Sequence, residues 1–375
     1  MIESSRLLRE LVALPSVNPA FAVGEGARTA EGQVVEFLAA MARQAGLEVE
    51  VRKVFPRRPN LLVRLAPRGR MRQRILLAAH TDTVDGAPEQ FRPQVRAGRL
   101  YGRGACDTKG SLAAMWAALA EAAVSPGRPR ATEIVFVGLV DEEHGQSGSR
   151  ALARSGMRAG LAVVGEPTRL RVVTAHKGNL WLKLQTRGKS AHGARPDLGH
   201  NAIHDMARAV ALLQTAYAKS LRNRRHPLLG RPTISVGSIA GGTQPNIVPD
   251  SCVAFADRRT LPGETERSVC RELRALLRAH GLRVAIADSK VGPCLPLETD
   301  PGLPAVRLLM ACAGQTAPAG VDFFCDAGVL AQAGIPSVVF GPGDIAQAHT
   351  ANEWVSLRAV ERATLILTRF LRSLP

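Results

Sequence analysis

The sequence of 375 residues predicts an α/β fold, a doubly wound and mostly parallel sheet that carries an inserted ferredoxin-like α+β domain. Near both ends of the chain, apolar runs of strand length alternate with helical patterns, as in a sheet covered by helices on both faces. Between them the order becomes strand, helix, two strands, helix, strand, which is the order of a ferredoxin-like domain.

Hydrophobic periodicity and the residues typical of helix starts and ends define the individual elements. Gly46, for example, suits the C-cap of the second helix. In the expected α/β domain, 1–177 and 291–375, helices are predicted at 3–13, 30–46, 110–123, 149–154, 303–313 and 357–371, and strands at 48–54, 61–65, 74–79, 133–140, 161–165 and 337–340. In the expected insertion, 178–290, strands are predicted at 180–186, 233–239, 252–257 and 282–287, and helices at 201–217 and 264–280.

The composition indicates a soluble, cytoplasmic protein. Its 46% hydrophobic content suits a large core. Charged residues interrupt the N-terminal apolar pattern, which argues against a secretory signal. The most apolar helix, 111–124, is shorter than the ~20 residues of a membrane span and contains Glu121. Six scattered cysteines without a CxxC pair argue against a disulfide framework and favour a reducing compartment. We therefore expect no membrane partner.

The formal net charge of +17 would suit an anionic partner. The arginines, however, are spread over the whole chain, and only short clusters such as 222–225 stand out. Aromatic residues make up 4% of the chain, so platforms for base stacking are scarce. We expect no nucleic-acid partner, and a basic surface that attracts acidic small molecules.

Acidic residues and a histidine follow several of the apolar segments. In a doubly wound sheet, sites form beyond the carboxyl ends of the strands, so these side chains are expected to meet there. Each alone is more often a cap or turn residue than a ligand, and the prediction depends on their convergence. The candidate ligands are His80, Asp107, Glu143, Glu166 and the late His349.

Two imidazoles and three carboxylates form a donor set that suits zinc, with cobalt or manganese as substitutes. Five ligands exceed the needs of one open catalytic zinc and suffice for two Zn²⁺ ions per chain. Asp107 suits the bridging position because its short side chain follows the tight 102–104 turn. Asp82 is expected to accept the other N–H of His80 and so fix its tautomer.

Glu142 and Glu143 are neighbours in a segment expected to be extended. Adjacent side chains of an extended backbone point in opposite directions, so the two carboxylates should not bind the same ion. If Glu143 is a ligand, Glu142 is free to act as the general base that moves a proton from water to the leaving nitrogen.

The same residues resemble the di-zinc metallopeptidase and amidohydrolase family that includes acetylornithine deacetylase, succinyl-diaminopimelate desuccinylase, aminoacylase and glutamate carboxypeptidase. The resemblance covers essentially the whole chain in order. The matching segments are AAHTDTVDG, LYGRGACDTKGSLAAM, VDEEHGQSGS, VVGEPT, SAHGARPDLGHNAI, GGTQPNIVPD, ADRRTLPGET and GPGDIAQAHTANEWV.

The resemblance implies a division of the ligands between two zinc ions. His80 and Glu166 would hold one ion, Glu143 and His349 the other, and Asp107 would bridge them. It also implies a cis peptide bond after Asp107.

The resemblance further implies that the inserted domain is a lid and a dimerisation domain. His192 would reach the site of a neighbouring subunit and stabilise the oxyanion, while Asn246 and Arg259 would grip the substrate, Arg259 by pairing with a carboxylate. Two departures bear on substrate preference rather than on metal binding. Asn352 stands where the family often has Asp, and Cys325 where it often has Thr.

These inferences predict a zinc-dependent amidohydrolase that cleaves the amide bond of an N-acylated amino acid through a metal-bridging hydroxide, as acetylornithine deacetylases do. Desuccinylation, or dipeptidase or carboxypeptidase activity at the same site, is the alternative. A non-catalytic, metal-binding dimeric scaffold would be a different class of protein. Such a scaffold needs ligands but no general base, so Glu142 favours the enzyme.

Overall fold

The computed structural model describes residues 3–22, 31–288 and 292–375. The chain divides into two compact units. We call the first the sheet unit; it comprises Met1–Ala175, Glu298–Gly320 and Cys325–Pro375. The second, the inserted unit, comprises His176–Leu297 and Val321–Phe324, a longer stretch than the predicted 178–290.

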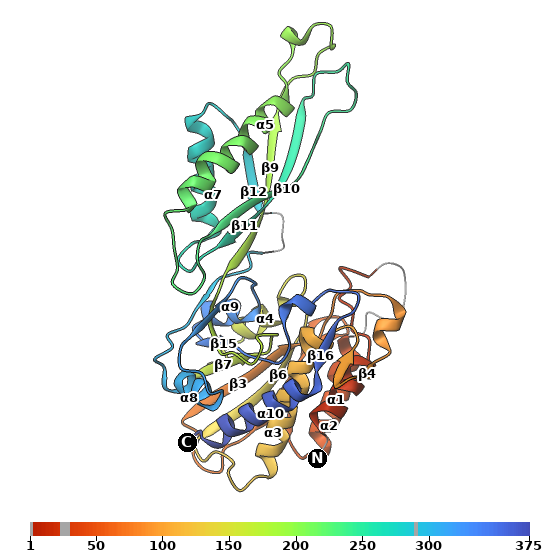
Figure 1. Cartoon of the computed structure of the whole chain (residues 1–375), viewed down its shortest axis with the longest axis vertical. Helices are drawn as coiled ribbons and strands as arrows, with labels where there is room; N and C mark the ends of the chain where they lie inside the picture. Colours follow the sequence, from red (N-terminus) through yellow and green to blue (C-terminus); the bar gives the residue numbers. More distant parts are fainter. Residues whose placement is uncertain (1–2, 23–30, 289–291) are drawn as a thin grey trace. The chain divides into compact units, whose positions relative to one another are not determined.

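The sheet unit is built on a large mixed sheet (Figure 1). Its middle strands run parallel, with β3 between β6 and β7 and with β15 beside β7, while β1, β2 and β8 pair antiparallel at the flanks. The α/β class with a mostly parallel sheet is thus confirmed. The strand order is β1 (Glu48–Phe55), β2 (Arg58–Leu65), β6 (Thr132–Leu139), β3 (Gln73–His80), β7 (Leu161–Val164), β15 (Ser337–Val339), β8 (Val173–His176) and β13 (Leu297–Glu298), with β14 (Ala319–Val321) paired to β8.

Helices cover both faces of this sheet. One apolar cluster joins one face of the sheet to α1 (Ser4–Val12), α2 (Glu31–Gln44), α3 (Gly110–Val124), α8 (Pro304–Cys312) and α10 (Leu357–Arg372). Two further helices, α4 (Ser147–Arg154) and α9 (Asp326–Gln332), contact each other, and α9 also contacts β7 and β15. The predicted start of α2, Ala30, lies outside the described residues.

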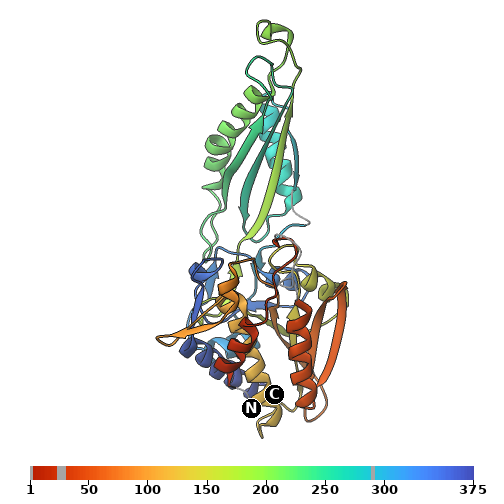
Figure 2. The ribbon, with the colours of Figure 1, turned by 90° about the vertical axis from the view of Figure 1, so that its right-hand side faces the viewer.

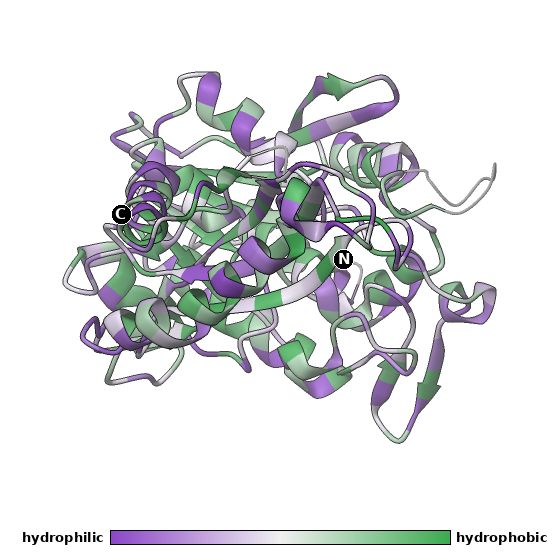
Figure 3. Cartoon of the chain, turned by 90° about the horizontal axis from the view of Figure 1, so that it is seen from above, coloured by the Kyte–Doolittle hydropathy of each residue, from purple (hydrophilic) through white to green (hydrophobic). Residues whose placement is uncertain are grey.

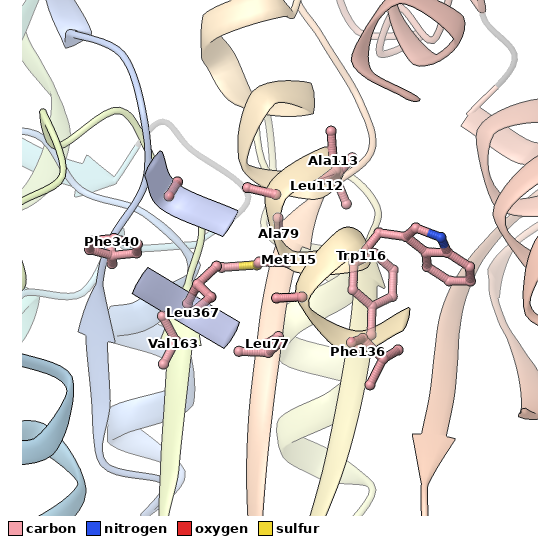
Figure 4. Packing of buried hydrophobic residues seen from close by; sticks show 14 of the residues in the cluster. Leu77, Ala79, Leu112, Ala113, Met115, Trp116, Phe136, Val163, Phe340 and Leu367 are labelled. Carbon is pink, nitrogen blue, oxygen red and sulfur yellow. The ribbon is translucent and has the colours of Figure 1, made fainter. Parts of the chain in front are cut away.

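Large side chains interlock in the core between α3, α10 and the sheet (Figure 4). The rings of Trp116 and Phe136 meet edge to face, with centroids 5.4 Å apart. Leu77 of β3, Met115 of α3 and Leu367 of α10 are buried in the same cluster. Coloured by hydropathy, the helices alternate apolar and polar segments, as expected of helices that bury one face (Figure 3).

A second, three-stranded sheet of the sheet unit was missed by the sequence analysis. Its strands are β4 (Gln94–Arg96), β5 (Arg99–Tyr101) and β16 (Trp354–Ser356). Strands of three residues are too short to show an alternating pattern. The short helical turns are η1 (Pro88–Phe91), η2 (Ala105–Lys109), η3 (Pro196–Leu198), η4 (Leu213–Tyr217) and η5 (Ile345–Gln347).

The inserted unit has the predicted ferredoxin-like order of elements. Its antiparallel sheet runs β10 (Thr233–Gly241), β11 (Ser251–Thr260), β9 (Gly178–Arg187) and β12 (Ala285–Asp288). The helices α5 (Ala202–Leu212) and α7 (Glu266–Ala279) run alongside this sheet (Figure 2). They share an apolar cluster with alternate strand residues such as Leu182 and Ala254. A short α6 (Ala218–Leu221) extends the predicted helix 201–217, and β12 begins later than the predicted 282.

In the described part of the chain, no helix is both long enough and apolar enough to cross a membrane.

The buried core of the sheet unit predicts a large stability difference between two leucine truncations. Leu77→Ala removes a fully buried side chain and should lower the free energy of unfolding by about 2–5 kcal/mol. Leu365→Ala removes a side chain that is 55% exposed and should change it by less than about 0.5 kcal/mol. Urea denaturation of both variants measures the difference, and equal losses would contradict this packing.

Candidate metal centre

The parallel strands of the sheet unit bring the candidate ligands to one edge. His80 ends β3, Glu142 and Glu143 follow the adjacent strand β6, and Glu166 follows β7 on the other side. The sequence analysis expected Asp107, like the other acidic candidate ligands, to follow a strand of the large sheet, and this was wrong. Asp107 lies in η2, after β5 of the small sheet and before α3.

Asp107 reaches the edge because the preceding turn is tight. Gly104 has a φ of 79°, and a Cβ there would lie 2.7 Å from Thr83 Cγ2, so only glycine fits. After Asp107 the peptide bond to Thr108 is cis, as the family resemblance implies. Thr108 Oγ1 then donates to the carbonyl oxygen of Gly165, 2.8 Å away, and so ties this turn to the segment that carries Glu166.

The carboxylate of Asp107 lies between two imidazoles. Its Oδ1 is 3.1 Å from Nε2 of His80, and its Oδ2 is 3.4 Å from Nε2 of His349. Nε2 of His80 also lies 3.9 Å from Oε1 of Glu166, and Nε2 of His349 lies 3.0 Å from Oε2 of Glu143. All five candidate ligands are therefore brought together, and two carboxylates accompany each imidazole.

The donor set fits divalent cations. Within the described chain, two groups each offer three donor atoms that lie within 4.8 Å of one another: His80 with Asp107 and Glu143, and His80 with Glu142 and Glu166. Oε1 of Glu143 and Oε1 of Glu166 are buried without a hydrogen-bond partner. Buried carboxylate oxygens of this kind need a proton, a donor or a cation.

Electrostatics in the site follow from crowded buried carboxylates. Burial raises the pKa of Glu142 and of Glu166 well above the ordinary value, and burial and the charge of Asp107 raise the pKa of Glu143 to about 7. Burial would also raise the pKa of Asp107, but hydrogen bonds from both histidines lower it. Carboxylates that are costly to ionise together are the groups that a bound cation stabilises.

The segment after β6 is a turn, so the expectation of an extended backbone there was wrong. Asp141 has a left-handed φ of 69°, and residues 142–145 form the turn. Oδ1 of Asp82 accepts from the backbone N–H of Glu142 at 3.1 Å, and Oδ2 from that of Glu143 at 3.2 Å. Hydrogen bonds to Asp82, and not strand alternation, therefore fix the backbone from which Glu142 and Glu143 project.

Asp82 also contacts His80, through the backbone more closely than through the side chain. Nδ1 of His80 lies 2.9 Å from the Asp82 carbonyl oxygen and 3.5 Å from its carboxylate Oδ1. If Nδ1 carries the hydrogen, it donates to this carbonyl, and Nε2 is left with a lone pair facing Asp107 and Glu166. Burial opposes protonation of His80, but hydrogen bonds to Asp107 and Asp82 raise its pKa well above the ordinary value.

Three buried side chains near the site escaped the sequence analysis. Asn18 donates through Nδ2 to Asp82 Oδ2 at 2.8 Å and to Asp141 Oδ1 at 2.9 Å. Asp326 accepts from Ser149 Oγ at 2.5 Å and interacts electrostatically with His80 and Asp82. Glu353 binds the turn before Asp107. Of these three, only Glu353 lies in a segment that matches the family, GPGDIAQAHTANEWV.

The remaining candidates, His192, Asn246 and Arg259, belong to the inserted unit. His192 and Asn246 are exposed on neighbouring segments, linked by a bridge from His192 to Ile247 and by Gly193 N–H donating to the Asn246 carbonyl at 2.7 Å. Arg259 lies near the other end of β11, roughly 25 Å along the strand from Ser251. There its Nε donates to Asp257 Oδ1 at 2.9 Å.

Comparisons with known proteins agree with this fold and indicate the family of the chain. Residues 76–373 match peptidase family M20/M25/M40. Acetylornithine deacetylase of Myxococcus xanthus is 32% identical over 355 residues, which is 90% of each chain. The fold and the site define the chain as a metal-dependent hydrolase. It belongs to peptidase family M20/M25/M40.

Solved structures share the fold. Aminopeptidase PepT of Bacillus cereus superposes with a TM-score of 0.80 at 23% identity, covering 99% of this chain and 98% of that one. The YXEP protein of Bacillus subtilis, a dinuclear metal binding peptidase, has a TM-score of 0.71 at 15% identity and covers 98% and 96%.

The pKa of His349 predicts proton release when a cation binds. Contacts with Asp107 and Glu143 raise this pKa to about 10, so the imidazole is protonated at pH 7 without a cation, whereas a metal ligand must be neutral. Zinc affinity should therefore rise by at least about tenfold per pH unit between about pH 6 and 8, since Glu143, with a pKa of about 7, also loses a proton on binding. Titration calorimetry in buffers of different ionisation enthalpy measures the protons released. His349→Gln should release fewer protons, and a wild-type affinity independent of pH would contradict the assignment.

Proposed function

We propose that this hydrolase binds two zinc ions and removes the acyl group from an N-acylated amino acid, as an acetylornithine deacetylase does. The observation that carries the proposal is the carboxylate of Asp107 between two imidazoles, each with a further carboxylate beside it. The similarity to the Myxococcus xanthus enzyme supports the acyl amino acid as substrate.

In this proposal His80 and Glu166 would hold one ion, Glu143 and His349 would hold the other, and Asp107 would contribute to both. When bound, such ions polarise the scissile carbonyl group and acidify water. Asp82 positions His80 through its backbone carbonyl and the 142–143 turn through its carboxylate. Cobalt or manganese could substitute for zinc, since the donor set mixes nitrogen and oxygen.

Glu142 is the proposed general base. Its carboxylate is buried and lies beside His80 and Glu166, so water is excluded from most of its surface. It takes a proton from the attacking water and passes it to the leaving nitrogen. Proton transfer of this kind needs the carboxylate ionised, which nearby cations would favour against the effect of burial on its pKa.

The inserted unit is proposed to act as a lid and dimerisation unit. In this role His192 supports the oxyanion of a neighbouring subunit, and Asn246 and Arg259 contact the substrate. The edge strand β10 carries Ile239, which is 51% exposed, and such an edge can pair with a second copy. A solution mass of one chain by light scattering would exclude the dimer.

A reducing, cytoplasmic location remains part of the proposal, and the buried thiols of Cys106 and Cys325 are compatible with it.

The alternative is cleavage of N-succinyl groups, dipeptides or C-terminal residues at the same site. Peptidases among the solved structures have the same fold, and at less than 25% identity they show the fold alone.

A Glu142→Gln variant tests the chemistry. It keeps the size of the side chain but cannot accept the proton, so kcat should fall by about 10²–10⁴ while zinc content stays at two per chain. Elemental analysis and steady-state kinetics measure both quantities. A loss of one zinc would instead make Glu142 a ligand, which its place beside His80 and Glu166 would permit.

The substrate proposal predicts a ranking. Among N-acetyl amino acids, N-succinyl amino acids and dipeptides, kcat/KM should be highest for an N-acetyl amino acid. A ninhydrin assay on a matched panel measures the released amine. If a dipeptide is preferred by tenfold or more, the peptidase alternative replaces the deacylase.

A further inference from the structure

Glu353 is a buried carboxylate with an unusual set of partners. Its side chain is 1% exposed. Oε1 accepts from the backbone N–H of Cys106 at 2.9 Å and of Asp107 at 3.0 Å. Oε2 accepts from the backbone N–H of Gly104 at 3.0 Å and from Nη1 of Arg103 at 2.8 Å. All four donors thus come from one short segment, the turn that ends at Asp107.

The backbone of Glu353 contacts the same turn, because the N–H of Gly102 donates to its carbonyl oxygen at 3.0 Å. Glu353 also lies on the loop that carries His349, four positions earlier in the chain. It therefore connects, by hydrogen bonds, the segments of two proposed ligands. On the far side of Asp107, Thr108 is fixed by its own bond to Gly165.

Only an ionised carboxylate fits these donors. Four hydrogens converge on two oxygens, and the guanidinium of Arg103 supplies the opposite charge. An amide of the same shape has one acceptor oxygen and an NH₂ group that donates. In Glu353→Gln the NH₂ group would therefore face two N–H donors in place of one of the carboxylate oxygens. Those hydrogen bonds would be lost, and the turn would loosen there.

We propose that Glu353 is a positioning residue of the metal centre, which fixes the backbone of the 103–107 turn and so aims Asp107 between His80 and His349. The inference rests on the proposed function, since it assigns Glu353 to the same two-ion site. Groups that hold metal ligands in place typically change metal affinity by 10–100-fold when they are lost.

Zinc titration of chelator-treated Glu353→Gln tests the proposal. The more weakly bound ion should lose affinity by about tenfold or more, measured by competition with a chromophoric chelator. The visible spectrum of the cobalt-loaded variant should also differ from that of the wild type, because the ligand geometry changes. Glu361→Gln, the same substitution at an exposed position of α10, is the matched control and should leave both readouts unchanged.

The outcomes separate positioning from a purely structural role. Wild-type affinity for both ions and an unchanged cobalt spectrum would overturn the proposal, even if the variant melted at a lower temperature. If Glu353→Gln does not fold, Glu353→Asp decides. Its shorter side chain cannot reach all three amides, so wild-type binding of both ions would again overturn the proposal.

The same titration distinguishes a failure of the two-zinc proposal from a failure of the proposal for Glu353. If the wild type binds a single ion, the two-zinc proposal is wrong. The comparison for that one ion still decides on Glu353, because Asp107 faces both histidines.

Discussion

The arrangement of the sheet unit depends on one carboxylate that must face two imidazoles. Asp107 can contact His80 and His349 only if the 102–109 turn, the end of β3 and the loop after β15 meet at the same point. The parallel pairing of β6, β3 and β7 brings the segments that carry Glu143, His80 and Glu166 to one edge of the sheet. Gly104 and Glu353 contact the turn that carries Asp107 to the same edge.

Several other acidic side chains are buried near this carboxylate. Glu142, Glu166 and Asp326 are buried near it, and burial raises the pKa of each. Burying several carboxylates close together lowers the stability of the folded chain, and hydrogen bonds from neighbouring groups offset part of this loss. Asp82 illustrates this, since it accepts from Asn18 and from two backbone amides while its own carbonyl contacts His80.

Strand ends were predictable from the sequence because buried strands leave long apolar runs. His80 and Glu166 were found in that way, and the family resemblance supplied their grouping. The left-handed Asp141 could not be predicted, since nothing in the residue type demands a positive φ, and the turn at Glu142 was mistaken for extended backbone. Glu353 was missed for a different reason. Its partners are mostly backbone amides, which every residue possesses, so no side-chain pattern reveals them.

The separation of the ligands along the chain has a consequence for how the protein matures. His80 is the first of the five in chain order and His349 the last, with the whole inserted unit emerging between Glu166 and His349. Domains generally fold as units while the ribosome extends the chain from its N-terminus. The complete set of ligands therefore exists only once nearly all of the chain has been synthesised. We expect metal binding to be a late step of biogenesis, because it requires both ends of the sheet unit to have come together.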